Sequence, residues 1–355
     1  MPYRLVIVDD SPLYRLRLSQ IFAASDKLQI VGLAGNGREA ISMIQARRPD
    51  VLLLDLDIPE LDGFSVLRWT MQNAPIPVIV CSGQSGSESI FEALEAGAID
   101  FITKPQLRHA IRSDEFAMHL RVRVETAAES KTVLAVKRPA KRPVNGMVGT
   151  TPVSKSESDI FHAGIVAIVG SAGSPACVAH IIRLLPEGLA TPLVIAIHMP
   201  RGFTRSFAEH LARVSGRNVG EARTGEVVCL NRVYVAPGGY HLEARTGSAG
   251  EICFELAATG PDDYYTPSAN RLLASIAETY GSTALGVVLT GMGDDGLSGA
   301  REIKAGDGKI LIESRESAAI WGMPRVVSEA GLADAELNQE ALANAISQYC
   351  VVNGK

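Results

Sequence analysis

Short apolar runs alternate with helical patterns along the first third of the chain. Each run has the length of one buried strand, and the stretches between the runs carry apolar residues at helical spacing. Strands that alternate with helices are typical of a parallel sheet with helices on both faces. We therefore predict a doubly wound α/β domain whose strands lie at residues 5–8, 28–31, 51–54, 78–81 and 101–103.

The same alternation returns in the second half of the chain and predicts a second doubly wound parallel sheet. We expect its buried strands at residues 165–169, 193–197, 285–289 and 309–312, and helices at 176–185, 203–214 and 267–280. Short runs at 227–229 and 233–235 predict two more strands. An alternating run at 252–256 predicts an antiparallel hairpin inserted near 225–257.

The composition changes between these two halves. Residues 130–158 hold three prolines and several Ser and Thr, and five Lys or Arg lie between Lys131 and Arg142. We interpret this stretch as an exposed connector, although a basic cluster could also bind an acidic partner or help to dock the two halves. The predicted division is a first domain at 1–128, a linker at 129–158 and a second domain at 159–355.

Composition and charge narrow the class of protein. The chain is 46% hydrophobic and 21% charged with a formal net charge of −5, so nothing favours a nucleic-acid partner. No apolar run approaches the roughly 20 residues that membrane insertion needs. The opening MPYRLVIVDD does not fit a signal peptide, so we expect a cytoplasmic protein. The five cysteines form no CxxC pair, and we expect reduced core residues.

Polar residues follow the predicted strands of the first half. In a parallel sheet these strand ends share one edge, so we expect their side chains to converge. Three carboxylates in one cleft suit Mg²⁺, and a carboxylate beside that ion and a lysine can accept a phosphoryl group. Scattered helix caps would explain any single acid but not the whole set. The residues are Asp9, Asp10, Asp55, Ser82 and Lys104.

Three further polar residues follow strands of the second half, namely Ser171, His198 and Asp295. A serine hydroxyl needs a base to become a nucleophile, and an imidazole base needs a carboxylate to fix its tautomer, so these types on one sheet edge suit acyl transfer. Taken singly, each could be structural. The chain order and Val169 do not fit the G-x-S-x-G hydrolases. Nucleotide binding is disfavoured, since G-x-G-x-x-G and a Walker lysine are missing.

Residues 1 to about 110 resemble a response-regulator receiver domain. The resemblance rests on VDDS (8–11), LLLDLDIPELDG (52–63), VIVCSG (78–83) and ALEAGAIDFITKP (93–105). It implies a flavodoxin-like (βα)5 fold in which a chemotaxis histidine kinase phosphorylates Asp55. It also implies that Asp9, Asp10 and Asp55 hold Mg²⁺, that Lys104 contacts the phosphoryl group and that Ser82 reports it.

The second half resembles the catalytic domain of chemotaxis protein-glutamate methylesterases. The matching segments are AIVGSAGSPA (167–176), HMPRGFTRSFAEHL (198–211), YVAPGGYHLE (234–243), TGMGDDG (290–296) and GMPR (322–325). The resemblance implies the triad Ser171, His198 and Asp295. It places the oxyanion hole at the backbone around Met292, with Gly173 and Gly291 in the surrounding loops.

Together the two resemblances imply a phosphorylation-activated esterase. Its substrates would be glutamyl γ-methyl esters, and also glutamines, on the cytoplasmic helices of chemoreceptors, and the ester chemistry would need no cofactor. The receiver would cover the catalytic edge until it is phosphorylated. The alternative is a phosphorylation-dependent module whose second domain binds receptors without catalysis. A transcription factor is disfavoured by the acidic balance and the lack of a helix-turn-helix pattern.

Two positions depart from the family's pattern. Ser174 stands where a second glycine usually follows the serine loop, and it could alter the loop because serine tolerates fewer backbone conformations. Asp294 stands where Asn often precedes the catalytic Asp, and it adds a charge beside the triad. The sequence does not decide the effect of either residue on activity.

Overall fold

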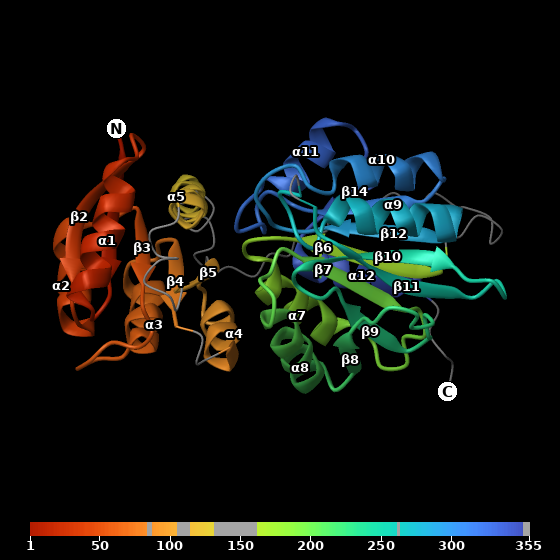
Figure 1. Cartoon of the computed structure of the whole chain (residues 1–355), viewed down its shortest axis with the longest axis horizontal. Coiled ribbons are helices and arrows are strands. Elements are labelled where there is room, and N and C mark those ends of the chain that lie inside the picture. The colour runs from red at the N-terminus through yellow and green to blue at the C-terminus, as the bar shows by residue number, and fades with distance from the viewer. Residues whose placement is uncertain (84–86, 105–113, 131–161, 261–262, 351–355) are drawn as a thin grey trace, which may run out of the picture.

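The computed structural model shows two α/β units that lie side by side (Figure 1). The structure describes residues 1–83, 87–104, 114–130, 162–260 and 263–350. No helix within those ranges is both long and apolar enough to cross a membrane. The prediction of a connector at 129–158 falls almost wholly outside them, because α5 ends at Glu129 and Ser130 is the last described residue before the gap.

The first unit is a five-stranded parallel sheet in the order β2-β1-β3-β4-β5. Its strands are β1 (Tyr3–Val8), β2 (Leu28–Ala34), β3 (Val51–Leu54), β4 (Val78–Ser82) and β5 (Asp100–Thr103). Its helices are α1 (Pro12–Ala23), α2 (Gly37–Arg47), α3 (Gly63–Asn73), α4 (Ser87–Glu95) and α5 (Asp114–Glu129).

Continuous apolar strands arise in this unit because both faces of the sheet are covered. Along β1, Leu5 and Ile7 face the core under α1 and α5, whereas Val6 and Val8 face the opposite core with α2 and α3. Every strand predicted in this half is confirmed. Polar residues begin where each strand leaves the sheet, which brings the strand-end residues to one edge.

The second unit is a seven-stranded parallel sheet in the order β14-β13-β12-β6-β7-β9-β8. Its strands are β6 (Ile165–Gly170), β7 (Leu193–Ile197), β8 (Asn218–Glu221), β9 (Arg232–Val235), β12 (Ala284–Val288), β13 (Lys309–Glu313) and β14 (Ala335–Leu337). Its helices are α7 (Ser174–Leu184), α8 (Phe203–Ser215), α9 (Ala269–Tyr280), α10 (Leu297–Ala305), α11 (Met323–Glu329) and α12 (Gln339–Tyr349), with a short 3₁₀ turn at Gly281–Thr283.

The predicted antiparallel hairpin is present as β10 (Tyr240–Thr246) paired with β11 (Ile252–Ala258). The strand predicted at 227–229 is wrong, because only Val227 makes an isolated bridge, to Cys253. The edge strands β8 and β14 are not foreseen, since both are short and only partly buried. The expectation of core cysteines holds for three of the five, whereas Cys229 is exposed and Cys253 is half-buried.

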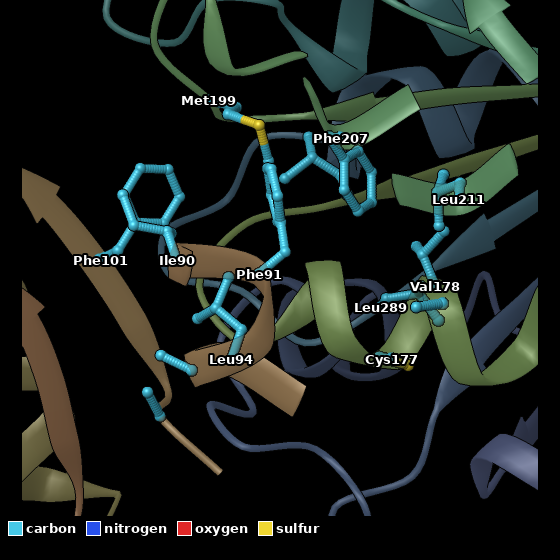
Figure 2. Close-up of a cluster of buried hydrophobic side chains, with 14 of the residues drawn as sticks. Ile90, Phe91, Leu94, Phe101, Cys177, Val178, Met199, Phe207, Leu211 and Leu289 are labelled. Atoms are coloured by element: carbon cyan, nitrogen blue, oxygen red, sulfur yellow. The ribbon is translucent and has the colours of Figure 1, made fainter. Parts of the chain in front are cut away.

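The two units meet through α4, which packs against α7 and α8. Phe91 of α4 points toward Met199 and Phe207 of the second unit (Figure 2). The ring centroids of Phe91 and Phe207 lie 5.4 Å apart. A second aromatic pair joins Phe101 of β5 to Phe203 of α8 at 5.1 Å. One buried apolar cluster therefore runs across both units.

Candidate active site

Ser171 begins the loop that joins β6 to α7. Its backbone N–H donates to the carbonyl of Thr290 at 3.0 Å, so the loop is tied to the segment after β12. The left-handed position of this turn is Gly173, with a φ of +82°. Ser174 is fully buried, and its hydroxyl donates to the carbonyl of Ser171. Since Gly173 takes the conformation that needs glycine, Ser174 fits the turn and adds a hydrogen bond to it.

His198 follows β7, and its Nε2 lies 2.8 Å from Oδ2 of Asp295. The Asp295 carboxylate sits at the N-terminus of α9. It accepts backbone N–H groups from Ala269 at 2.7 Å and Asn270 at 2.8 Å, and the Ser268 hydroxyl at 3.1 Å. Burial acts to raise the pKa of Asp295, but the hydrogen bonds from His198 and the helix N-terminus outweigh it and lower that pKa. The carboxylate therefore stays ionised beside the imidazole.

Ser171 and His198 line one cavity of about 320 Å³. No hydrogen bond joins the two side chains among the described residues, a common situation in unliganded sites of this kind. Because Nε2 faces Asp295, Nδ1 is the ring nitrogen left for the serine. Asp294 is exposed and does not belong to the cavity lining. The structure thus brings together the three residues predicted from separate strand ends.

The loop after β12 shapes the opposite wall of this cavity. The N–H of Gly291 donates to the carbonyl of Ile320 at 3.0 Å, so it is not available to a ligand. A Cβ atom at Gly291 would lie 2.9 Å from Cβ of Ser171, so only glycine fits there. Met292 also lines the cavity, and its N–H has no partner among the described residues. Gly291 therefore shapes the loop, whereas Met292 offers a free donor.

Residues of the first unit also line the cavity. The sequence does not predict which of its side chains do so. They come from α5, where Thr126 Oγ1 lies 2.7 Å from Sδ of Met292. Tyr264 and Tyr265 come from the loop before α9, a stretch without apolar periodicity. The cavity residues contributed by α5 are His119, Val122 and Arg123.

A separate acidic cluster lies at the strand ends of the first unit. Lys104 forms ion pairs with Asp55 and, at 2.7 Å, with Asp9. Burial raises the pKa of Asp55, and Lys104 opposes that effect. Burial acts to lower the pKa of Lys104, but the ion pairs with Asp55 and Asp9 outweigh burial and raise that pKa. Ser82 is buried at the end of β4, and no hydrogen bond joins its side chain to Asp55 in the described part of the chain.

The donor set of this cluster fits a magnesium ion. One oxygen from each of Asp9, Asp10 and Asp55 lies within 4.8 Å of the others. Asp9 and Asp55 are buried, whereas Asp10 is exposed, so an ion held there would keep contact with water. Hard carboxylate oxygens with room for several waters are the environment that Mg²⁺ prefers.

Comparison with known proteins gives the same division of the chain. Residues 166–346 match the family model described as CheB methylesterase, and residues 5–114 match that of the response regulator receiver domain. A protein-glutamate methylesterase/protein-glutamine glutaminase from Geobacter sulfurreducens is 35% identical over 98% of this chain and 97% of its own length. One from Syntrophomonas wolfei is 35% identical over 96% and 98%.

A solved structure is similar to about half of this chain. The crystal structure of the Thermotoga maritima CheB methylesterase catalytic domain is 36% identical to this chain, with a TM-score of 0.51. It covers 53% of this chain and 99% of the Thermotoga chain.

Proposed function

Because the chain belongs to the CheB family of protein-glutamate methylesterase/protein-glutamine glutaminases with an N-terminal receiver domain, we propose that Ser171, His198 and Asp295 carry the hydrolysis. The observation that supports this assignment most is their convergence. The His198–Asp295 hydrogen bond of 2.8 Å lies beside the cavity that also holds Ser171. We retain residues 159–355 as the catalytic domain and 1–128 as the receiver.

In this mechanism Nδ1 of His198 takes the proton as Ser171 attacks the ester carbonyl. The same proton then leaves with methanol, and a water activated by His198 releases the glutamate from the serine. With a glutamine side chain, ammonia leaves in place of methanol. General base catalysis contributes roughly 10²–10⁴-fold. In the same proposal the N–H of Met292, which has no partner among the described residues, stabilises the oxyanion, and one such donor contributes roughly 10²–10³-fold.

The proposed substrate is a glutamyl γ-methyl ester on the cytoplasmic helices of a chemoreceptor. Family membership supports this choice, and so does the wall of the cavity. The part of the lining that the second unit supplies includes Arg201 and, among the described residues, no carboxylate, so this wall suits a segment that becomes acidic as its ester is hydrolysed.

We propose that the receiver inhibits the esterase by covering this cavity with α5. A chemotaxis histidine kinase would phosphorylate Asp55, with Lys104 contacting the phosphoryl group and Ser82 sensing it. Asp9, Asp10 and Asp55 would hold the Mg²⁺, which when bound neutralises charge on the phosphoryl oxygens. Ser82 ends β4 immediately before the loop to α4, so a change there reaches the helix that holds the two domains together.

The catalytic assignment is tested by methanol release from a methylated receptor fragment. His198→Gln and Asp295→Asn should each lower the rate at least about 10³-fold without loss of fold. The first substitution removes the general base, and the second removes the carboxylate that fixes the tautomer of His198. The rival, a receptor-binding module without catalysis, predicts no release by the unsubstituted chain. Activity of the His198→Gln variant near the unsubstituted rate would overturn the proposed role of the base.

A further inference from the structure

The face of the His198 ring is covered by the side chain of Tyr265. The two rings are nearly parallel, at an interplanar angle of 14°, and their centroids lie 4.6 Å apart. Tyr265 also lines the cavity that holds Ser171. The stack is therefore part of the site, but it has no role in the mechanism proposed for Ser171, His198 and Asp295.

Asp295 alone does not fix the plane of the imidazole. Its hydrogen bond at Nε2 holds one edge of the ring, but the ring can still tilt about that bond and move Nδ1 away from Ser171. A flat side chain against the ring face opposes this tilt, because tilting breaks the stacked contact. Ser171 does not hold the ring, since no hydrogen bond joins it to His198 in the described part of the chain.

Tyr265 is itself held by its neighbours. Its ring meets the ring of Tyr264 edge-on, at 80° and 4.9 Å between centroids. Its hydroxyl lies against Gly293, where a Cβ atom would overlap the hydroxyl oxygen. Ser268, which follows in the same segment, donates its hydroxyl to Asp295. One segment thus supports both the face of His198 and the carboxylate at its edge.

We propose that Tyr265 is a positioning residue for the esterase reaction, and this rests on the proposed roles of Ser171 and His198. Its ring keeps the imidazole in the plane where Nδ1 faces the Ser171 hydroxyl while Nε2 keeps its bond to Asp295. The aromatic ring carries the effect, because the ring makes the stack. A residue of this kind acts on the chemical step more than on ester binding, so kcat responds more than KM.

The test compares Tyr265→Phe, which keeps a ring, with Tyr265→Leu, which does not. Both are made in the full chain, activated with acetyl phosphate and Mg²⁺, and assayed for methanol release from a methylated receptor fragment. We expect the phenylalanine variant to stay within about twofold of the unsubstituted chain and the leucine variant to lose about five- to tenfold in kcat. Tyr280→Leu is the matched control, since Tyr280 is a half-buried tyrosine at the other end of α9.

The outcomes separate positioning from other roles. A fall in kcat for leucine that exceeds any change in KM, with phenylalanine active, supports the proposal. The proposal is overturned if kcat of the leucine variant changes by less than about threefold, or if its KM changes as much as kcat or more. It is also overturned if the phenylalanine variant loses as much kcat as the leucine variant. Thermal unfolding checks the fold, and Tyr265→Met replaces the leucine variant if that variant does not fold. Lack of methanol release by the unsubstituted chain contradicts the proposed function instead.

Discussion

Reversing one charge between the two domains should activate the esterase without phosphorylation. Glu95, at the end of α4, accepts a hydrogen bond from Arg183 of α7 at 2.6 Å. His210 of α8 lies 3.4 Å from the same carboxylate oxygen. Burial lowers the pKa of His210, although Glu95 opposes that effect, so the ring is neutral near pH 7. Of these two partners of Glu95, Arg183 is therefore the one that carries a positive charge.

The size of the effect follows from this one pair. The side chains of Arg183 and Glu95 are 46% and 34% exposed, so their attraction contributes at most about 1 kcal/mol. Glu95→Arg removes that attraction and adds a repulsion of similar size. The closed arrangement should lose about 1–2 kcal/mol, which corresponds to a rise of roughly 5- to 30-fold in the open population.

The assay is methanol release by the full chain without phosphodonor. Glu95→Arg should raise this basal rate, and adding Arg183→Glu should bring it back toward the original by restoring an opposite pair. Glu92→Arg is the matched control, because Glu92 is exposed on the same helix and has no ion pair among the described residues. If Glu95→Arg left the basal rate unchanged, or if the charge swap did not reverse its effect, the proposed inhibitory interface would be wrong.

Three further predictions concern single groups. Ser174→Ala removes a buried hydroxyl that donates a hydrogen bond to the Ser171 carbonyl, so urea unfolding should show a loss of about 1 kcal/mol; equal stability would contradict a supporting role for Ser174. Burial acts to raise the pKa of Glu243, but the ion pairs with Arg271 and Arg245 outweigh burial and lower that pKa. The stabilising effect of Glu243 is therefore present above about pH 4.5 and is lost as the pH falls through the lowered pKa. The stability gap between the unsubstituted chain and Glu243→Gln should therefore shrink between about pH 7 and pH 3, and a constant gap would refute this. Asp10→Ala should raise the Mg²⁺ concentration needed for activation by acetyl phosphate and leave basal methanol release unchanged; an unchanged Mg²⁺ titration would exclude Asp10 as a ligand.

The sheets could be predicted because their strands are buried on both faces. A short apolar run such as residues 165–169, bounded by turn residues, is typical of a strand that is buried on both faces of a parallel sheet. Strand ends at one edge then bring Ser171 and His198 together without any knowledge of side-chain contacts. The receiver cluster follows the same rule, since Asp55 and Lys104 come directly after β3 and β5.

Features that depend on tertiary contact could not be predicted in this way. The short strands β8 and β14 pair at sheet edges where apolar burial is partial, so their sequence pattern is weak. Tyr265 lies in a loop without periodicity, and its stack on His198 exists only once α9 is placed. Whether Gly291 or Met292 has a free N–H depends on the backbone hydrogen bond to Ile320, which no local pattern encodes.

The proposed role of Ser171 as nucleophile is tested most directly by methanol release from Ser171→Ala, measured in the full chain with and without acetyl phosphate and Mg²⁺. We expect the phosphodonor to stimulate methanol release by the unsubstituted chain. The Ser171→Ala variant should unfold at the same temperature and release methanol at least about 10³-fold more slowly under either condition. Release by this variant within about tenfold of the unsubstituted rate would contradict a serine nucleophile at this position.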